Sequence, residues 1–337
     1  MLASSCAVVP TASPFTFYEM PTELSGPCDI CEGHDGYVYI QNFLVDTLVK
    51  LNPATGERTE YQIPYKNPPS PTSVLPGLGS RTALACAIRP GNDGKIYAAS
   101  GVRNEIVVLD PLTGTVNVFA QPANNPLGNL FPFNDLWPGE TGMFFSQVTG
   151  NTVSLFDYDT HDFQNFQPPT PLSGPLGMRT STDGALWFTE FLARKIGRLN
   201  ATSGQITEYP LPITLQGPSV LRVEEGPYLY FTAQEGNGIG RIEKTTGEID
   251  VYTYPVPLSL PTEDTQDKDG NVWFSTISQN SLQYLTPSTG KFTTIPLPGN
   301  VLNLVPPFVN IAINYGPGNA IWFAELTTNK VGRYQIA

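Results

Sequence analysis

Charged residues are scarce in this sequence, and basic ones most of all. Asp, Glu, Lys and Arg make up 14% of the 337 residues, against about 25% in a typical domain. The 18 basic and 30 acidic residues leave a formal net charge of -12. No basic stripe exists to neutralise phosphate, which argues against nucleic acid and against an anionic membrane surface as partners. No apolar run approaches the roughly 20 residues of a membrane-spanning helix.

Cysteine is also rare, with Cys6, Cys28, Cys31 and Cys86 only. Cys28-x-x-Cys31 has the spacing of a redox or zinc half-site, but no second Cys or His pair accompanies it. We therefore expect structural thiols or disulfides, and Cys6 could pair with one of the others if the protein is secreted. The opening residues 1–14 lack the length and charged start of an intact signal peptide, and could equally be the remnant left after one is removed. Secretion is an expectation on that second interpretation.

Glycine (31) and proline (33) are abundant and punctuate a repeated unit. Its clearest copy is residues 174–212, in which Asp183-Gly184 is a two-residue hairpin signal. An alternating β-like run follows, then a second run, a turn that ends at Gly204, and a further strand. Counting the segment before the first turn, the unit predicts four short strands in about forty residues. Pro210 ends the last strand, because proline cannot donate to the ladder.

Weaker copies of this unit run along the whole chain, each with aromatic residues shortly after its first turn glycine. Those glycines are Gly36, Gly94, Gly142, Gly184, Gly226, Gly270 and Gly318. Their steps of 42 to 58 residues fit propeller repeats. The sequence therefore predicts an all-β fold, a seven-bladed β-propeller of four-stranded blades that forms a single domain over 1–337. Unrelated hairpins in a sandwich are the alternative, which the constant order of the paired turns disfavours.

The seventh copy stops at Ala337, directly after its third strand. Residues 15–20 echo the last strand of the unit, since FYEMP is similar to TEYPLP. We predict that this N-terminal strand completes the last blade and closes the ring without a gap.

Chain direction within a blade assigns the two faces of the ring. The short Asp-Gly and Thr-Gly turns lie on one face, which we call the trimmed face, and the longer connections lie on the other, the top face. Three long apolar links, 65–79, 121–132 and 297–308, are expected to roof an axial pocket on the top face. Packing of these links onto neighbouring blades is the alternative.

Two sets of residues are candidates for this pocket. The apolar set, expected to bind substrate, is Tyr65, Phe131, Phe133, Trp137, Leu302 and Phe308. The polar set, expected to act in catalysis, is Gln147, Gln234, Asn134, Asn310, Arg103 and Glu190. Amide and guanidinium groups can donate hydrogen bonds to a carbonyl oxygen.

The unit at 174–212 resembles the repeat of the virginiamycin B lyase (streptogramin lyase) family. Echoes of it are DGNVWFS at 269–275, NAIWFAE at 319–325 and GIGRIEKTTGEI at 238–249. The resemblance covers essentially all seven repeats and implies a propeller with its site at the axial opening. It also implies the activity of the family's lyases, which open a cyclic depsipeptide ester by elimination. Those lyases use Mg²⁺, histidine and glutamate at the axial opening.

The family's histidines typically follow the proline that opens an inner strand. Here the equivalent places hold Cys28, Leu176, Ser219 and Thr262. The only histidines, His34 and His161, are predicted on trimmed-face turns, far from the pocket. A general base must lie within hydrogen-bond reach of the proton it removes, so the family's lyase chemistry does not carry over directly.

Three functions remain open. The first is a cofactor-free pericyclase for an apolar natural product, by similarity to fungal lyase-like propellers that act as hetero-Diels–Alderases. Holding two reactants in register is worth roughly 7–11 kcal/mol of barrier. The second is a lyase or lactonase that uses Mg²⁺ or Ca²⁺ bound by Asp29, Asp135 and Glu263 with Asn134 or Asn310. The third is a non-catalytic interaction ring with an open top surface.

Overall fold

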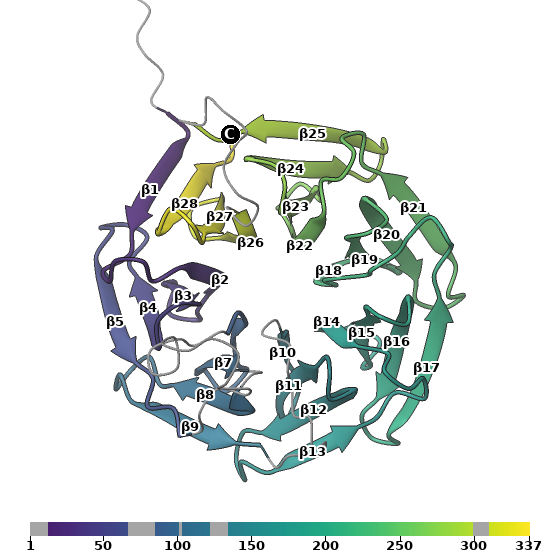
Figure 1. The fold of residues 1–337 in the computed structure, drawn as a ribbon, viewed down its shortest axis with the longest axis horizontal. Helices are drawn as coiled ribbons and strands as arrows, with labels where there is room; N and C mark the ends of the chain where they lie inside the picture. The colour runs from purple at the N-terminus through teal and green to yellow at the C-terminus, as the bar shows by residue number, and fades with distance from the viewer. Residues whose placement is uncertain (1–12, 67–84, 101–102, 122–133, 299–309) are drawn as a thin grey trace, which may run out of the picture.

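The computed structural model describes residues 13–66, 85–100, 103–121, 134–298 and 310–337. Within these ranges the chain forms seven four-stranded antiparallel sheets, arranged as a ring around a central axis (Figure 1). The described residues contain no helix, and hence none long and apolar enough to span a membrane. The prediction of an all-β, seven-bladed propeller is confirmed.

In blades one to six the strands run in chain order from an inner strand at the axis to an outer strand at the rim, and in blade seven the N-terminal strand is the outer one (Figure 1). Blade one contains β2 (Pro27–Glu32), β3 (Val38–Asn42), β4 (Thr47–Leu51) and β5 (Arg58–Gln62). Blade two contains β6 (Ile88–Pro90), β7 (Ile96–Ser100), β8 (Glu105–Leu109) and β9 (Val116–Ala120). Blade three contains β10 (Leu136–Pro138), β11 (Gly142–Gln147), β12 (Thr152–Asp157) and β13 (Phe163–Phe166).

The later blades follow the same plan. Blade four contains β14 (Pro175–Thr180), β15 (Leu186–Glu190), β16 (Lys195–Asn200) and β17 (Gln205–Pro210). Blade five contains β18 (Val223–Glu225), β19 (Tyr228–Ala233), β20 (Gly238–Glu243) and β21 (Ile249–Thr253). Blade six contains β22 (Pro261–Gln266), β23 (Val272–Thr276), β24 (Ser281–Thr286) and β25 (Lys291–Pro296). Blade seven contains β26 (Asn310–Gly316), β27 (Ala320–Glu325), β28 (Lys330–Gln335) and β1 (Phe15–Glu19).

Blade seven is closed by the N-terminal strand, as the sequence predicts. β1 pairs antiparallel with β28, with Phe15 opposite Tyr334 and Glu19 opposite Lys330. The rings of Phe15 and Phe17 pack edge-on against Phe323 in the middle of the blade. The first and last described segments are therefore joined by a ladder and by buried aromatic surface.

The aromatic residues after each turn glycine form the core between blades. Along β15, Trp187 and Phe188 point to opposite sides of the sheet and enter two different apolar clusters. Gly197 lies opposite Phe188 on the next strand, and a Cβ there would come within 2.2 Å of the Phe188 ring. A glycine at this place lets the ring lie flat against the neighbouring strand.

Both histidines lie on trimmed-face turns, as predicted. His34 is in the β2–β3 turn, where its Nε2 is 2.9 Å from the carbonyl oxygen of Gly91. His161 is in the β12–β13 turn with a φ of 61°, and its ring stacks on Phe156 at 5.5 Å. Both imidazoles are thus engaged at the end of the molecule opposite the predicted pocket.

Candidate functional site

The inner strands enclose two hollows at opposite ends of the axis. The top-face hollow measures about 640 Å³ with its mouth included. Its apolar wall consists of Leu176, Phe191, Val220, Ile277 and Ile311. Its polar and ionisable lining consists of Asn134, Ser219, Gln234, Thr262, Arg222 and Glu263, with Cys86 at the edge. No imidazole lines it in the described part of the chain.

The rim of this hollow is built by the first residues of the inner strands. β14 and β22 begin with proline, and the ladder register shifts directly afterwards. Neighbouring blades are tied at this level by hydrogen bonds to main-chain oxygens. Thr189 Oγ1 donates to the oxygen of Ser219 at 2.7 Å, and Thr262 Oγ1 donates to that of Ile311 at 3.2 Å. Hydrogen bonds between blades therefore hold the inner strands together at the rim of the top-face hollow.

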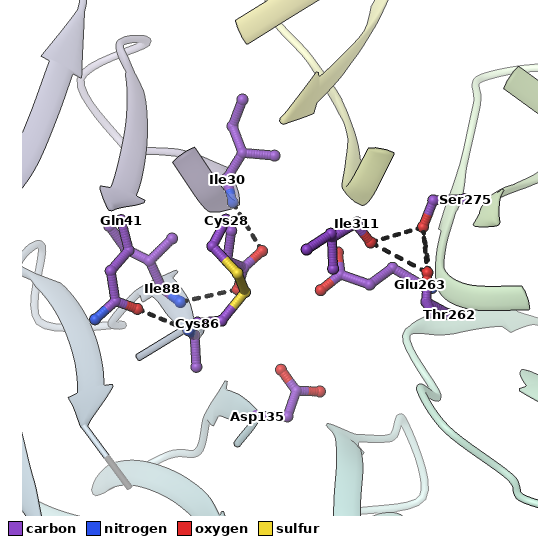
Figure 2. Close-up of a disulfide and its surroundings, with 12 residues drawn as sticks. Cys28, Ile30, Gln41, Cys86, Ile88, Asp135, Thr262, Glu263, Ser275 and Ile311 are labelled. Atoms are coloured by element: carbon purple, nitrogen blue, oxygen red, sulfur yellow. Dashed lines mark hydrogen bonds between the residues drawn. A yellow bond between two sulfur atoms is a disulfide. The ribbon is translucent and has the colours of Figure 1, made fainter. Parts of the chain in front are cut away.

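Between blades one and two the tie is covalent. Cys28 and Cys86 form a disulfide with a Cα–Cα distance of 5.3 Å (Figure 2). Cys28 is fully buried, and Ile311 packs against the pair. Cys31 lies on the same strand but is a free, buried thiol that borders the other hollow. The two cysteines of the C-x-x-C motif thus do not pair, and Cys6 lies outside the described residues.

A group of buried charges separates the two hollows, and we call it the axial charge cluster: Asp29, Arg89, Asp135, Arg222 and Glu263. Arg89 Nη1 lies 3.2 Å from Asp29 Oδ2, and Arg222 Nη2 lies 2.8 Å from Asp135 Oδ1. Arg222 Nη1 is 2.7 Å from Glu263 Oε2. Arg222 borders both hollows, so the cluster forms the floor of each.

Burial changes the titration of this cluster. It raises the pKa of Asp135 to about 7, with the guanidinium of Arg89 opposing the shift. It also raises the pKa of Glu263 well above its usual value, and the nearby Asp29 carboxyl adds to that shift. A carboxyl group that holds its proton near neutral pH can donate a hydrogen bond as well as accept one.

A model of the virginiamycin B lyase family matches residues 77–337. The chain belongs to this family. A streptogramin B lyase structure superposes with a TM-score of 0.79 at 25% identity, covering 95% of this chain and 96% of that one. Virginiamycin B lyase from Staphylococcus aureus gives 0.80 at 24% identity, covering 96% and 99%. Among curated proteins, no sequence matches the chain.

A third solved structure is a catalytically inactive histidine-to-alanine variant of the Staphylococcus aureus virginiamycin B lyase with quinupristin, at 25% identity and a TM-score of 0.78, covering 96% of this chain and 100% of that one. In the present member of the virginiamycin B lyase family, the places after the inner-strand prolines hold Cys28, Leu176, Ser219 and Thr262. None of these side chains is an imidazole.

The oxygen donors proposed for a divalent metal do come together at the axis. Asp29, Asp135 and Glu263 all belong to the axial charge cluster, but two guanidinium groups lie among them. Within the described ranges, no group of three or more His, Cys, Asp or Glu side chains could hold a metal ion. Positive charges at 2.7 to 3.2 Å occupy the directions from which carboxylates would bind Mg²⁺ or Ca²⁺. The donor set therefore does not fit the metal that the family implies.

Two of the predicted polar residues reach the top-face hollow, namely Asn134 and Gln234. Asn134 donates through Nδ2 to the main-chain oxygen of Ser146. Its own Oδ1 is buried and has no hydrogen-bond partner in the described structure. Asn310 begins β26, and only its backbone is described.

The other predicted polar residues lie elsewhere. Gln147 donates to the side chain of Gln121 in a small polar hollow beside blades two and three. Arg103 stacks at 4.4 Å over the ring of Tyr65, and neither side chain lines the top-face hollow. Glu190 is fully buried at the end of β15, where burial raises its pKa to about 8.

The predicted apolar residues are placed less favourably. Trp137 lies on β10 at the hollow on the trimmed face, beneath the guanidinium of Arg179 at 5.0 Å. Trp137 follows Asn134 along the chain, and Asn134 is the residue of this segment that lines the top-face hollow. Phe131, Phe133, Leu302 and Phe308 lie outside the described residues, as do most of the three long links.

Several lining residues escaped the sequence analysis. Phe191 and Ile277 directly follow the second strands of their blades, so their position after WFTE and WFST is a usable signal. Arg89 and Arg222 each interrupt an apolar inner-strand segment. A lone arginine in such a segment indicates a buried carboxylate partner.

Proposed function

We propose that this member of the virginiamycin B lyase family is an enzyme that cyclises an apolar natural product in the top-face hollow. The reaction is of the pericyclic, hetero-Diels–Alder type, and the protein acts by positioning and by hydrogen bonding. Family membership supports a lyase-like or related enzymatic role. The step from that role to cyclisation is the proposal.

One observation carries it, the composition of the hollow's lining. The wall is mostly apolar, and its two ionisable groups, Arg222 and Glu263, are paired with each other at 2.7 Å. A surface of this kind binds and orients an apolar ligand while a few polar groups set its direction. A pericyclic step moves electrons around a ring of atoms without transfer of a proton, so it needs no base.

Gln234 is the side chain best placed to help. It lines the hollow as the first residue of the β19–β20 loop, directly after β19, and no hydrogen bond from its side chain is found in the described structure. Its amide can therefore donate to a carbonyl oxygen of the substrate and stabilise negative charge that develops there. Gln147, in contrast, is engaged with Gln121.

Cleavage of a C–O bond by elimination is the second candidate, and Glu263 favours it. This residue is the one carboxyl group that lines the top-face hollow among the described side chains. As a carboxylate it could remove a proton, although its ion pair with Arg222 and its raised pKa weaken it as a base at neutral pH. No metal takes part in this scheme.

Two variants and a chelator separate the candidates. Heterodiene and alkene pairs, and separately quinupristin, would be incubated with the protein and the products followed by mass spectrometry. Cyclisation predicts an adduct of summed mass whose formation is insensitive to EDTA and is slower by about 100- to 1,000-fold in Gln234→Leu. Gln205→Leu, at an exposed site on β17, is the matched control. Formation of linearised quinupristin by the wild type, and no such product with Glu263→Gln, would establish the lyase instead.

We also propose that the protein folds in an oxidising compartment, consistent with secretion. The Cys28–Cys86 disulfide supports this, because structural disulfides persist in such compartments. Mass mapping of the protein from its native host would test it. Recovery with Cys28 and Cys86 fully reduced would refute it.

A further inference from the structure

The hollow on the trimmed face is a second enclosed site that the proposed function does not use. It measures about 780 Å³ with its mouth included, and it is lined from all seven inner strands or the residues next to them. Unlike the top-face hollow, it is lined mainly by charged and polar side chains. The axial charge cluster forms its floor, so a ligand here would not meet one on the top face.

The arginines around this hollow already have carboxylate partners. Arg89 pairs with Asp29, and Arg222 pairs with Asp135. Arg179 lies 3.3 Å from Glu224. No guanidinium of this lining is therefore left to receive an anion.

Two carboxyl groups of the lining have no cation partner in the described structure. Asp264 is fully buried, and its Oδ1 accepts the main-chain N–H of Arg222 at 3.0 Å. Its Oδ2 has no hydrogen-bond partner among the described residues. Asp264 also borders the hollow. Glu32, at the end of β2, also borders the hollow and makes no ion pair with a described residue. β2 and β22 both pack against β26, so the two carboxyls flank one blade.

We propose that the trimmed-face hollow binds a small organic cation, an alkylammonium or diammonium ion, with Asp264 and Glu32 as its carboxylate anchors. A buried oxygen without a partner is costly, and an ammonium group would supply the missing donor and charge. The hollow is large enough for a short alkyl chain between two such groups. An ammonium ion has no need of the convergent oxygen ligands that a divalent metal requires.

Proton release should accompany binding. The charged groups that act on Asp264 are Glu263 on its own strand, Arg179 on β14 and Arg89 on β6. Burial, with Glu263, raises the pKa of the Asp264 carboxyl despite these two arginines. The incoming ammonium therefore displaces a proton, and affinity increases as pH rises.

Calorimetric titration of the full chain with putrescine tests the site. We expect saturable one-to-one binding that tightens as pH rises, because burial raises the pKa of the Asp264 carboxyl and less of it is ionised at low pH. Asp264→Asn should weaken it at least about tenfold, and Glu32→Gln should weaken it as well. Glu57→Gln, at a solvent-exposed turn, should bind as the wild type does, and 1,4-butanediol should not bind.

Absence of saturable heat up to about 10 mM putrescine, or equal affinity in wild type and Asp264→Asn, would overturn the proposal. If Asp264→Asn does not fold, unchanged affinity in Glu32→Gln overturns it equally. Loss of this site would leave cyclisation in the top-face hollow untouched, so the two proposals fail independently.

Discussion

Breaking the Cys28–Cys86 disulfide should lower the free energy of unfolding by about 4 kcal/mol. The bond joins positions 58 residues apart, so it restricts the whole of blade one in the unfolded chain. The loop-entropy relation gives about 14 cal/mol/K for a loop of this length, or about 4 kcal/mol at 25 °C. The unfolding entropy of a 337-residue chain is about 0.7 kcal/mol/K, which converts the loss to about 6 °C in Tm.

The assay compares Tm with and without dithiothreitol by circular dichroism. Reduction of the wild type isolates the cross-link, because no atom other than hydrogen is added. In Cys28→Ala/Cys86→Ala, the reductant should change nothing, since the bond is already absent. Cys31→Ala, at the free buried thiol, is the control that keeps the bond and should retain the full response to reductant.

A decrease in Tm of less than about 2 °C on complete reduction would refute the stabilisation calculated for the disulfide. It would mean that the rim hydrogen bonds hold blade one without the cross-link, or that the unfolded chain is already restricted there. Ligand affinity at the top-face hollow should fall on reduction, because Cys86 borders that hollow.

Three further predictions concern stability. Arg222→Met leaves Glu263 without its cation and leaves Asp135 with only Arg89 at 3.9 Å, so it should cost about 3–5 kcal/mol in urea unfolding; an unchanged midpoint would contradict the role assigned to the cluster. The pKa of Glu190 is raised to about 8, so its stabilising contribution is complete at low pH and is lost as pH rises from about 4.5 to about 8. Glu190→Gln should therefore show a smaller loss of stability over that range, measured as urea midpoints against pH, whereas a parallel loss would sink the assignment. Gly197→Ala should lower stability by about 1–3 kcal/mol, because the new methyl overlaps the Phe188 ring at 2.2 Å; calorimetry showing no change in Tm would contradict it.

The repeat was predictable because its signals are local. The turn glycines, the aromatics after them and the prolines at strand ends each act over a few residues. Their spacing along the chain therefore predicts the number of blades. The closing strand was found in the same way, since its residues resemble the outer strands that it replaces.

The site was predictable only in part. Asn134 and Gln234 were found because they occupy the top-face ends of their strands. Trp137 was assigned to the top-face hollow but lies at the trimmed-face hollow. An inner strand crosses from one face of the ring to the other within a few residues, so a small error in position changes the face. Gln147 ends β11, but its side chain donates a hydrogen bond to Gln121 of the neighbouring blade instead of lining the top-face hollow.

The sequence by itself determined the ring: its all-β fold class, the number of its blades, its closure by residues 15–19, and the position of both histidines on the trimmed face. Only the tertiary structure decided which cysteines pair and which carboxyls meet a guanidinium. Cys28 and Cys86, or Asp135 and Arg222, belong to separate repeats. They meet because inner strands from distant parts of the chain converge on one axis, and no short-range pattern encodes that distance.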